Sequence, residues 1–385
     1  MRPSTLLRGA ALWALLLLAA CGNSGTADQS ASLASPAASA AGAANASASA
    51  AASAAASASP RASAAASVAA RPSPSAAPAT ITAGPDEFIN PVIDRDFPDP
   101  DTLRVGERYY IYATNTGSTN VQAASSDDLV TWDTLPDALP TLPAWAEPGR
   151  TWAPEVTASA DGQSYIMYFT AHDRASDKQC IGVATSAKPE GPFESAGEQP
   201  LICPVDQGGA IDASSFADED GARYVLWKND GNCCGFTTYL YLQRVSDDGL
   251  TLQGEPAQLL TNDQAWEGRL VEAPTLWKQD GRYYLFYSAN DYSGLNYAIG
   301  VASADQITGP YRKSAKPLMS SDLKTGGAFG PGGQDVVLDD DQEPWLVYHS
   351  WDTMVAYRRV QIDELEWQDG MPMVKGPDRG PQPRP

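Results

Sequence analysis

The chain has 385 residues and a formal net charge of −21 at neutral pH, from 47 acidic residues against 26 lysines and arginines. This excess of negative charge excludes nucleic acid as a partner, because the phosphate backbone would be repelled. An acidic surface suits a soluble extracellular domain that acts on a neutral substrate.

The segment 1–20 is typical of a signal peptide. Arg2 and Arg8 form a basic start, and Ala10–Ala20 form an apolar run too short to span a bilayer. The segment Leu18-Ala19-Ala20-Cys21 resembles a bacterial lipobox, in which the cysteine is acylated. We predict lipidation at Cys21 and an extracytoplasmic protein whose only link to a bacterial membrane is this lipid. The alternative is an ordinary cleavage site that happens to precede a cysteine.

Residues 21–84 are mostly Ala, Ser and Pro, with hardly any aromatic or charged side chain. Such a segment has too little apolar area to offset its chain entropy, so we expect a disordered tether behind the acylated cysteine. Residues 85–385 are sufficient for one large domain with its own core.

Four cysteines remain in this domain, and outside the cytoplasm they can form disulfides. Four cysteines allow three pairings, and we favour Cys180–Cys203 with the adjacent pair Cys233–Cys234. A zinc site is disfavoured because the spacing gives no CxxC motif and the chain has only two histidines.

A repeat of about sixty residues runs through the domain. Each copy has a turn followed, three residues later, by a strand rich in aromatic residues. Three of the five turns are Asp-Gly, the strongest short hairpin signal, and the fifth has Asp-Gln instead. The aromatic strands begin at nearly even intervals along the chain, at Tyr109, Tyr165, Tyr224, Tyr284 and Trp345.

Further short strands follow each aromatic strand, and few stretches carry a helical period. Repeated units of four antiparallel strands without helices predict an all-β fold, a five-bladed β-propeller over residues 85–385. A β-sandwich with chance similarity between strands is the alternative that five regularly spaced anchors disfavour.

A carboxylate lies ten to twelve residues before each anchor, at the expected start of the first strand of each blade. Since first strands line the axis of a propeller, we expect these five acids to converge on one cavity. Solvated loop acids are the alternative for any one of them. The five are Asp99, Glu155, Asp212, Glu272 and Asp335.

At these residues the chain resembles glycoside hydrolase family 43, over about Asn90 to Val374. The matching stretches are Phe97-Pro98-Asp99-Pro100-Asp101, Trp152-Ala153-Pro154-Glu155, Ile211-Asp212-Ala213-Ser214, Val271-Glu272-Ala273-Pro274 and Tyr348-His349-Ser350-Trp351. The resemblance implies hydrolysis with inversion of configuration, with Asp99 as general base and Glu272 as general acid. It also implies that Asp212 orients the acid and adjusts its pKa.

We predict substrate contacts from Trp152, Glu155, Arg269 and His349. Glu155 and His349 have a simpler alternative, as hydrogen-bonded residues of the channel. No cofactor is expected to be required and no metal ligand is assigned. Some family members hold an axial calcium through the histidine of a Gly-Pro-Gly-His motif, but this chain has Gly333 at that place. His349 or Asp335 would be the remaining ligands for such an ion.

The expected partner is an oligosaccharide or polysaccharide that contains arabinose or xylose, bound by a monomer. Family β-xylosidases often carry a β-sandwich after the propeller, whereas this sequence reaches Pro385 soon after the last anchor at Trp345. We therefore favour arabinofuranosyl linkages of plant cell-wall polysaccharide, by endo or exo cleavage. The alternatives are a β-xylosidase of the same family and a surface lipoprotein that binds carbohydrate without cutting it.

Overall fold

The structure is a computed structural model that describes residues 81–385. The predicted signal peptide, Cys21 and all but the last residues of the predicted tether lie outside this range. No helix in the described part of the chain is long and apolar enough to cross a bilayer.

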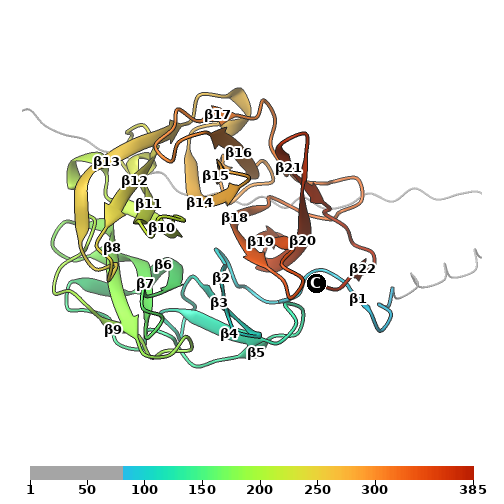
Figure 1. The fold of residues 1–385 in the computed structure, drawn as a ribbon, viewed down its shortest axis with the longest axis horizontal. Coiled ribbons are helices and arrows are strands. Elements are labelled where there is room, and N and C mark those ends of the chain that lie inside the picture. The colour runs from blue at the N-terminus through green and yellow to red at the C-terminus, as the bar shows by residue number, and fades with distance from the viewer. Residues whose placement is uncertain (1–80) are drawn as a thin grey trace, which may run out of the picture. The chain divides into compact units, whose positions relative to one another are not determined.

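The described residues form five sheets of four antiparallel strands in chain order, besides one two-stranded sheet, and this confirms the predicted five-bladed β-propeller. The first strand of each sheet stands nearest the common axis (Figure 1). Blade 1 contains β2 (Asp101–Val105), β3 (Arg108–Ala113), β4 (Gln122–Ser126) and β5 (Asp133–Thr134); blade 2 contains β6 (Ala146–Ala158), β7 (Tyr165–Asp173), β8 (Lys178–Ser186) and β9 (Glu194–Ser195). Blade 3 contains β10 (Ala210–Ala217), β11 (Arg223–Asn229), β12 (Tyr239–Val245) and β13 (Leu252–Thr261); blade 4 contains β14 (Val271–Gln279), β15 (Arg282–Ala289), β16 (Ala298–Ala304) and β17 (Arg312–Lys313). Blade 5 contains β18 (Gly332–Leu338), β19 (Pro344–Trp351), β20 (Arg358–Gln368) and β21 (Met371–Lys375).

The predicted aromatic strands are the second strands of the blades. The turn before each one needs a residue with positive φ, and glycine provides it in four blades at no steric cost. In blade 5 Gln342 adopts the same conformation, with φ of 65°. Asp-Gln therefore makes the same turn as Asp-Gly at a small conformational cost.

The apolar core lies between neighbouring blades rather than inside one of them. One cluster joins blades 1 and 2, another joins blades 2 and 3, and a third joins blades 3 and 4. The fourth residue of every aromatic strand is at most 3% exposed, and each such ring contributes about 1.5–3 kcal/mol by burial. These residues are Tyr112, Tyr168, Trp227, Tyr287 and Tyr348.

The ring is closed by the two ends of the described chain. Strand β1 (Glu87–Phe88) pairs with β22 (Gln382–Pro383) beside blade 5 (Figure 1). The Asn90 side chain donates to the carbonyl of Ile362 at 2.8 Å and accepts from its N–H at 3.0 Å. Blade 1 and blade 5 are thus held together by backbone and side-chain hydrogen bonds.

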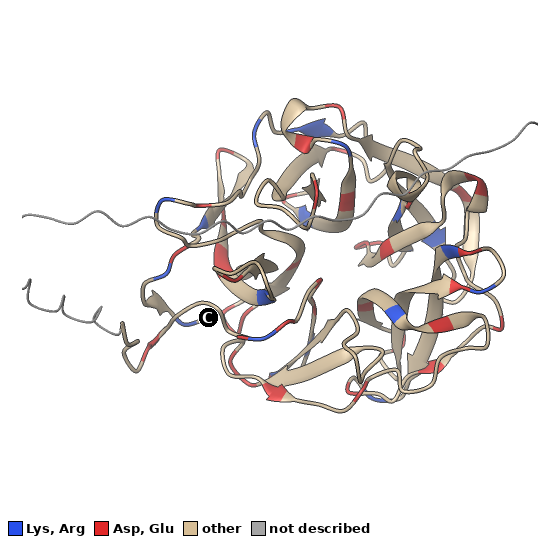
Figure 2. Cartoon of the chain, turned by 180° about the vertical axis from the view of Figure 1, so that it is seen from behind, with Lys and Arg blue, Asp and Glu red and all other residues tan. Residues whose placement is uncertain are grey.

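Two disulfides are present, Cys180–Cys203 and Cys233–Cys234, and this confirms the favoured pairing. The first joins β8 to the segment that leads into blade 3. The second lies in the loop after β11, next to a short 3₁₀ turn at Gly231–Cys233. Acidic residues are spread over all five blades (Figure 2), as the net charge leads one to expect.

Candidate active site

Each blade has a residue with positive φ, between 38° and 56°, near the axis; it lies within the first strand in blades 2 to 5 and two residues before β2 in blade 1. In blades 2 to 5 this residue sits in a break of the strand register, a β-bulge. Left-handed backbone is unfavourable for residues with a side chain and is concentrated at functional sites. The five positions are Asp99, Ala153, Asp212, Ala273 and Gly333.

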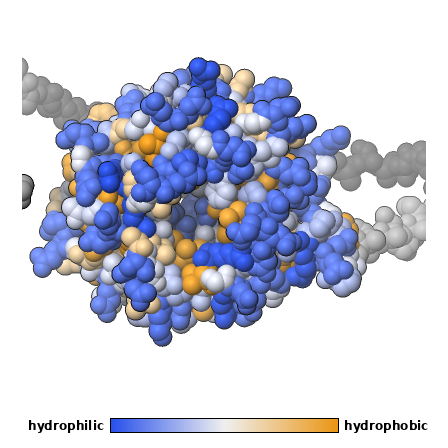
Figure 3. All heavy atoms as spheres, viewed as in Figure 1, coloured by the Kyte–Doolittle hydropathy of each residue, from blue (hydrophilic) through white to orange (hydrophobic). Residues whose placement is uncertain are grey.

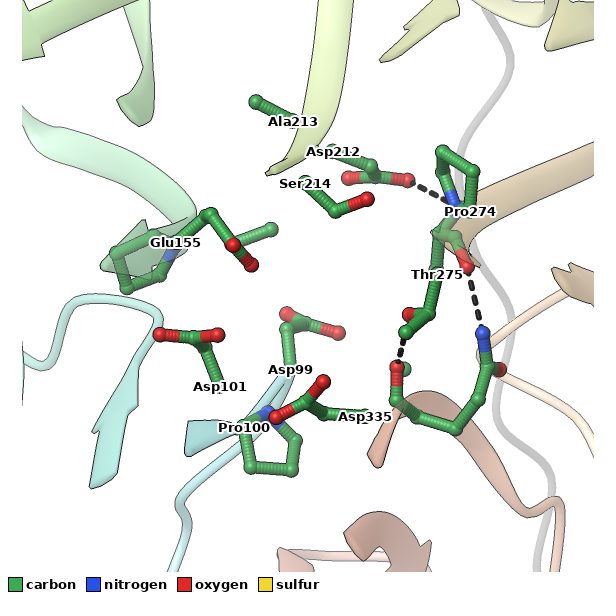
Figure 4. Close-up of a pocket in the computed structure, with 15 residues that line it drawn as sticks. Asp99, Pro100, Asp101, Glu155, Asp212, Ala213, Ser214, Pro274, Thr275 and Asp335 are labelled. Atoms are coloured by element: carbon green, nitrogen blue, oxygen red, sulfur yellow. Dashed lines mark hydrogen bonds between the residues drawn. The ribbon is translucent and has the colours of Figure 1, made fainter. Parts of the chain in front are cut away.

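The bulge sends neighbouring side chains into two different spaces. A large pocket of about 600 Å³ is lined by Asp99, Asp212 and Glu272, at the bulge or just before it. A small axial cavity of about 40 Å³ receives the carboxylates two residues after a position of positive φ, Asp101, Glu155 and Asp335, and Asp99 and Asp212 line it as well (Figure 4). The face seen in Figure 3 is hollowed near the axis. Four of the five predicted acids, Asp99, Glu155, Asp212 and Asp335, therefore meet at the axial cavity as expected, whereas Glu272 lines only the large pocket.

Asp99 is held in its ionised form. Its Oδ2 accepts a 2.7 Å hydrogen bond from the Thr114 hydroxyl, and its Oδ1 lies 3.4 Å from the guanidinium of Arg358. Burial acts to raise the pKa of Asp99, but the charge of Arg358 and the Thr114 hydrogen bond outweigh it and leave this pKa below its ordinary value. An ionised carboxylate in a pocket of this size can take a proton from water.

Asp212 and Glu272 form a second group across the pocket, which we call the acid pair. Asp212 Oδ2 accepts from the N–H of Ala273 at 3.1 Å, so the Asp212 side chain reaches from β10 to the bulge of β14, next to Glu272. Burial, and next the charge of Glu272, raise the pKa of Asp212 to about 8. At neutral pH the acid pair therefore carries a proton while Asp99 does not.

Glu272 is bound by two donors. Lys228 Nζ lies 2.8 Å from its Oε2, and the hydroxyl of Tyr297 donates to its Oε1 at 2.8 Å. Glu272 is only 8% exposed and Lys228 is 0% exposed. The carboxylate is therefore fixed in place at the wall of the pocket.

Glu155 does not line the large pocket, and its place favours the alternative that it is a hydrogen-bonded residue of the channel. Its Oε1 accepts from the N–H of Ser215 at 2.9 Å and from the Ser215 hydroxyl at 2.5 Å. Burial raises the pKa of Glu155, and burial followed by the charge of Glu155 raises the pKa of Asp335 to about 8. The position two residues after the bulge aims Glu155 at the axis (Figure 4).

His349 is also absent from the pocket wall, and its place likewise favours the alternative of a hydrogen-bonded residue of the channel. Its ring is fully buried and lies nearly parallel to that of Tyr297, at an angle of 8° with centroids 5.9 Å apart. Burial lowers the pKa of His349 to about 3, so the ring is neutral, and its Nδ1 accepts from the N–H of Asp99 at 3.0 Å. His349 supports the backbone of Asp99 from behind.

Trp152 and Arg269 do line the large pocket, in keeping with the prediction that they contact substrate. The sequence reading missed Lys228, Tyr297 and Arg358 in the same wall. Lys228 had a detectable signal, since it is a charged residue at the end of an otherwise buried strand. Tyr297 and Arg358 come from a loop and from the start of a third strand, where the repeat gives no such signal.

The axial cavity has the donors that a hard cation prefers. Asp101, Glu155 and Asp335 each offer carboxylate oxygens, and the buried Ser214 hydroxyl has no hydrogen-bond partner within residues 81–385. A side chain at Gly333 is excluded, because its Cβ would lie 2.6 Å from His349 Nδ1. These acids and Ser214, rather than a histidine at position 333, are the oxygen donors that an axial calcium would meet.

The family model described as glycosyl hydrolases family 43 matches residues 88–372. A β-D-galactofuranosidase of Aspergillus niger is 29% identical over 73% of this chain and 82% of its own length. An extracellular exo-α-(1→5)-L-arabinofuranosidase of Cellvibrio japonicus is 26% identical, over 72% and 86%.

A xylosidase/arabinosidase of Humicola insolens is 30% identical over 73% of this chain, and the match spans about half of that protein, 53%. The crystal structure of a thermostable family-43 glycoside hydrolase superimposes with a TM-score of 0.70 and 33% identity, over 77% of this chain and 99% of the other. The resemblance inferred from the motifs thus extends over the whole ring of blades.

Proposed function

This chain is a glycosidase that belongs to glycosyl hydrolase family 43, and we propose that it hydrolyses arabinofuranosyl linkages with inversion of configuration. The observation that carries the proposal is the contrast across the large pocket. Asp99 on blade 1 has a lowered pKa, whereas the acid pair on blades 3 and 4 holds a proton. Two carboxyl environments that push pKa values apart are what an acid and a base require.

In the proposed reaction Asp99 takes a proton from a water molecule, and the oxygen of that water bonds to the anomeric carbon. The glycosidic bond breaks on the opposite face, and the leaving oxygen receives the proton of Glu272. Asp212 supports this donation by sharing the proton of the acid pair. Thr114 and Arg358 keep the base ionised before the step, and His349 fixes its backbone.

The substrate preference rests on the relatives. The names of the Aspergillus and Cellvibrio proteins are those of furanosidases, and the name of the Humicola protein gives both a xylosidase and an arabinosidase activity. A β-xylosidase is the second candidate, and a β-D-galactofuranosidase is a third that the Aspergillus relative favours. A carbohydrate binder without activity would have no use for a base and a protonated acid pair in one pocket.

An aryl glycoside panel tests the proposal. The protein is incubated with aryl α-L-arabinofuranoside, aryl β-D-galactofuranoside and aryl β-D-xyloside, with Asp99→Asn as control, and the first-formed anomer is read by NMR. Release from the arabinofuranoside with inversion supports the proposal. Release of the aryl group from only one of the other two glycosides reassigns the substrate. Binding of oligosaccharide without cleavage of any of the three would identify a carbohydrate-binding protein without activity. Products from linear arabinan, monomer or ladder, distinguish exo from endo cleavage.

Three further proposals concern the setting of the enzyme. We propose that Cys21 carries a lipid that anchors the protein to a bacterial membrane outside the cytoplasm, and that the catalytic domain acts as a monomer. We also propose that no metal is required for the chemistry. A calcium at the axial acids would stabilise the ring by neutralising their charge, and no proton transfer assigned above depends on it.

A further inference from the structure

A lysine is fully buried beside the acid pair. Lys228 lies at the end of β11, next to the apolar residues Val225, Leu226 and Trp227, and its side chain is 0% exposed. Burying a charged group costs several kcal/mol unless the group is paired. The same place in the other four blades is taken by Ala113, Phe169, Ser288 and His349, so the propeller itself does not need a cation here.

The charge of Lys228 is directed at carboxylates. Its Nζ lies 2.8 Å from Glu272 Oε2 and 3.9 Å from Asp230 Oδ1. Burial acts to lower the pKa of Lys228, but Glu272, Asp212 and Asp230 together outweigh it and keep the ammonium charged. Lys228 is therefore a fixed positive charge within the proposed acid machinery.

This charge bears on the location of the catalytic proton. Lys228 donates to one oxygen of Glu272 and Tyr297 to the other, so both oxygens of this carboxyl group already have donors. The raised pKa of Asp212 then identifies Asp212 as the proton carrier before substrate binds. A leaving group is protonated by Glu272 only when this proton moves across the acid pair.

We propose that Lys228 is a positioning residue that sets how tightly the acid pair holds its proton and stabilises Glu272 once that proton has gone to the leaving group. The proposal deepens the proposed function and rests on it. Asp230 moderates Lys228 by its opposite charge. The other charged or titratable groups that face this cluster are Lys178 from β8, Tyr297 before β16, Asp99 before β2, Arg358 from β20 and Arg269 on the pocket rim.

Lys228→Met is the central variant, because it removes the charge and keeps the length of the side chain. Without the ammonium the acid pair holds its proton more tightly. The basic limb, where kcat/KM falls as the pH rises, should therefore move to a pH about one to three units higher. The fall in kcat should be at least tenfold larger for an aryl glycoside with a poor leaving group than for one with an activated leaving group. A purely structural role would lower all rates alike and leave the limb in place.

Asp230→Asn tests the sign of the effect and does not depend on the folding of the first variant. Removal of this carboxylate strengthens the field of Lys228, so the basic limb should move downward. Lys278→Met is the matched control, since Lys278 forms a half-buried pair with Asp218 at 2.7 Å on the far part of β14. It should leave the pH profile unchanged.

A measurement without substrate separates this proposal from the proposed function. The stretching band of protonated carboxyl groups is titrated by infrared spectroscopy in the wild type and in each variant, with Asp212→Asn to assign the band. An upward move in Lys228→Met and a downward move in Asp230→Asn support the proposal even where no glycoside is cleaved. The proposal would be overturned if both variants fold and neither the infrared titration of the carboxyl band nor the basic limb of kcat/KM moves. An inactive wild type with the expected band shifts would overturn only the proposed function.

Discussion

The positive charge of Arg358 should determine the acid limb of the activity. Its guanidinium is 3.4 Å from Asp99 Oδ1 and lies over the rings of Tyr292 and Trp351 at 5.1 and 5.7 Å. The side chains of Arg358 and Asp99 are 15% and 23% exposed, so solvent screens the pair only in part. Arg358→Met removes the charge and retains much of the packing against the two rings.

The size of the effect follows from this distance. With an effective dielectric constant of about 20, Coulomb's law gives about 5 kcal/mol at 3.4 Å, an upper limit because water reaches both groups. Neighbouring opposite charges usually lower a carboxyl pKa by about one to three units, or about 1.4–4 kcal/mol. Because the pKa of Asp99 is lowered in the native protein, loss of Arg358 must raise it.

The assay is the pH dependence of kcat/KM on an aryl glycoside that the wild type cleaves. As the proposed base, Asp99 is active only when ionised, so the acid limb of Arg358→Met should move to higher pH by about one to three units. Arg358→Lys keeps a positive charge and should move the limb less. An acid limb of Arg358→Met within 0.3 pH units of wild type (about the precision of such a fit), in a folded protein, would refute the electrostatic account of Asp99.

Two further predictions come from the structure and a third, on Cys21, from the sequence. Glu272→Gln should reduce cleavage of substrates with poor leaving groups by about 10²–10⁴-fold and spare activated ones, whereas Asp99→Asn should reduce both alike; equal profiles for the two variants would remove the acid and base assignments. Gly333→Ala places a Cβ 2.6 Å from His349 Nδ1 and 3.0 Å from Asp99 Oδ1, so kcat/KM should fall about 100-fold while the protein stays folded, as a thermal unfolding curve can check. Cys21→Ser should move the protein from the membrane fraction to the medium, and continued membrane association would contradict lipidation.

The sequence alone was sufficient to predict the fold. Aromatic strands that recur at nearly even intervals, with a turn before each, specify one blade per repeat, and the buried fourth residue of each strand follows from the same period. These are local features: a hairpin is formed by residues close in the chain, and a blade must bury its faces against its neighbours. The three proposed catalytic acids were also accessible, because each lies in a short motif at a similar distance from an anchor.

Only the tertiary structure decided which acids share a space. Asp99 and Asp101 are two residues apart and both line the axial cavity, yet only Asp99 also lines the large pocket, because a positive φ at Asp99 turns the chain between them. The sequence analysis placed Glu155 among the substrate contacts, because the bulge that precedes Glu155 in β6 is not visible in the sequence. Residues two apart in a strand normally point to the same face, so their spacing in the sequence does not reveal a bulge that changes this.

The partners of the acids were beyond the sequence for a related reason. Lys228 meets Glu272 across 44 positions of the chain, and Arg358 meets Asp99 across 259. Such contacts arise only when the ring closes and brings blades 3 and 4, or blades 1 and 5, side by side. The residue types that do the proposed chemistry were readable from the chain, whereas the charges that decide their protonation depend on side chains that only the closed propeller brings into contact.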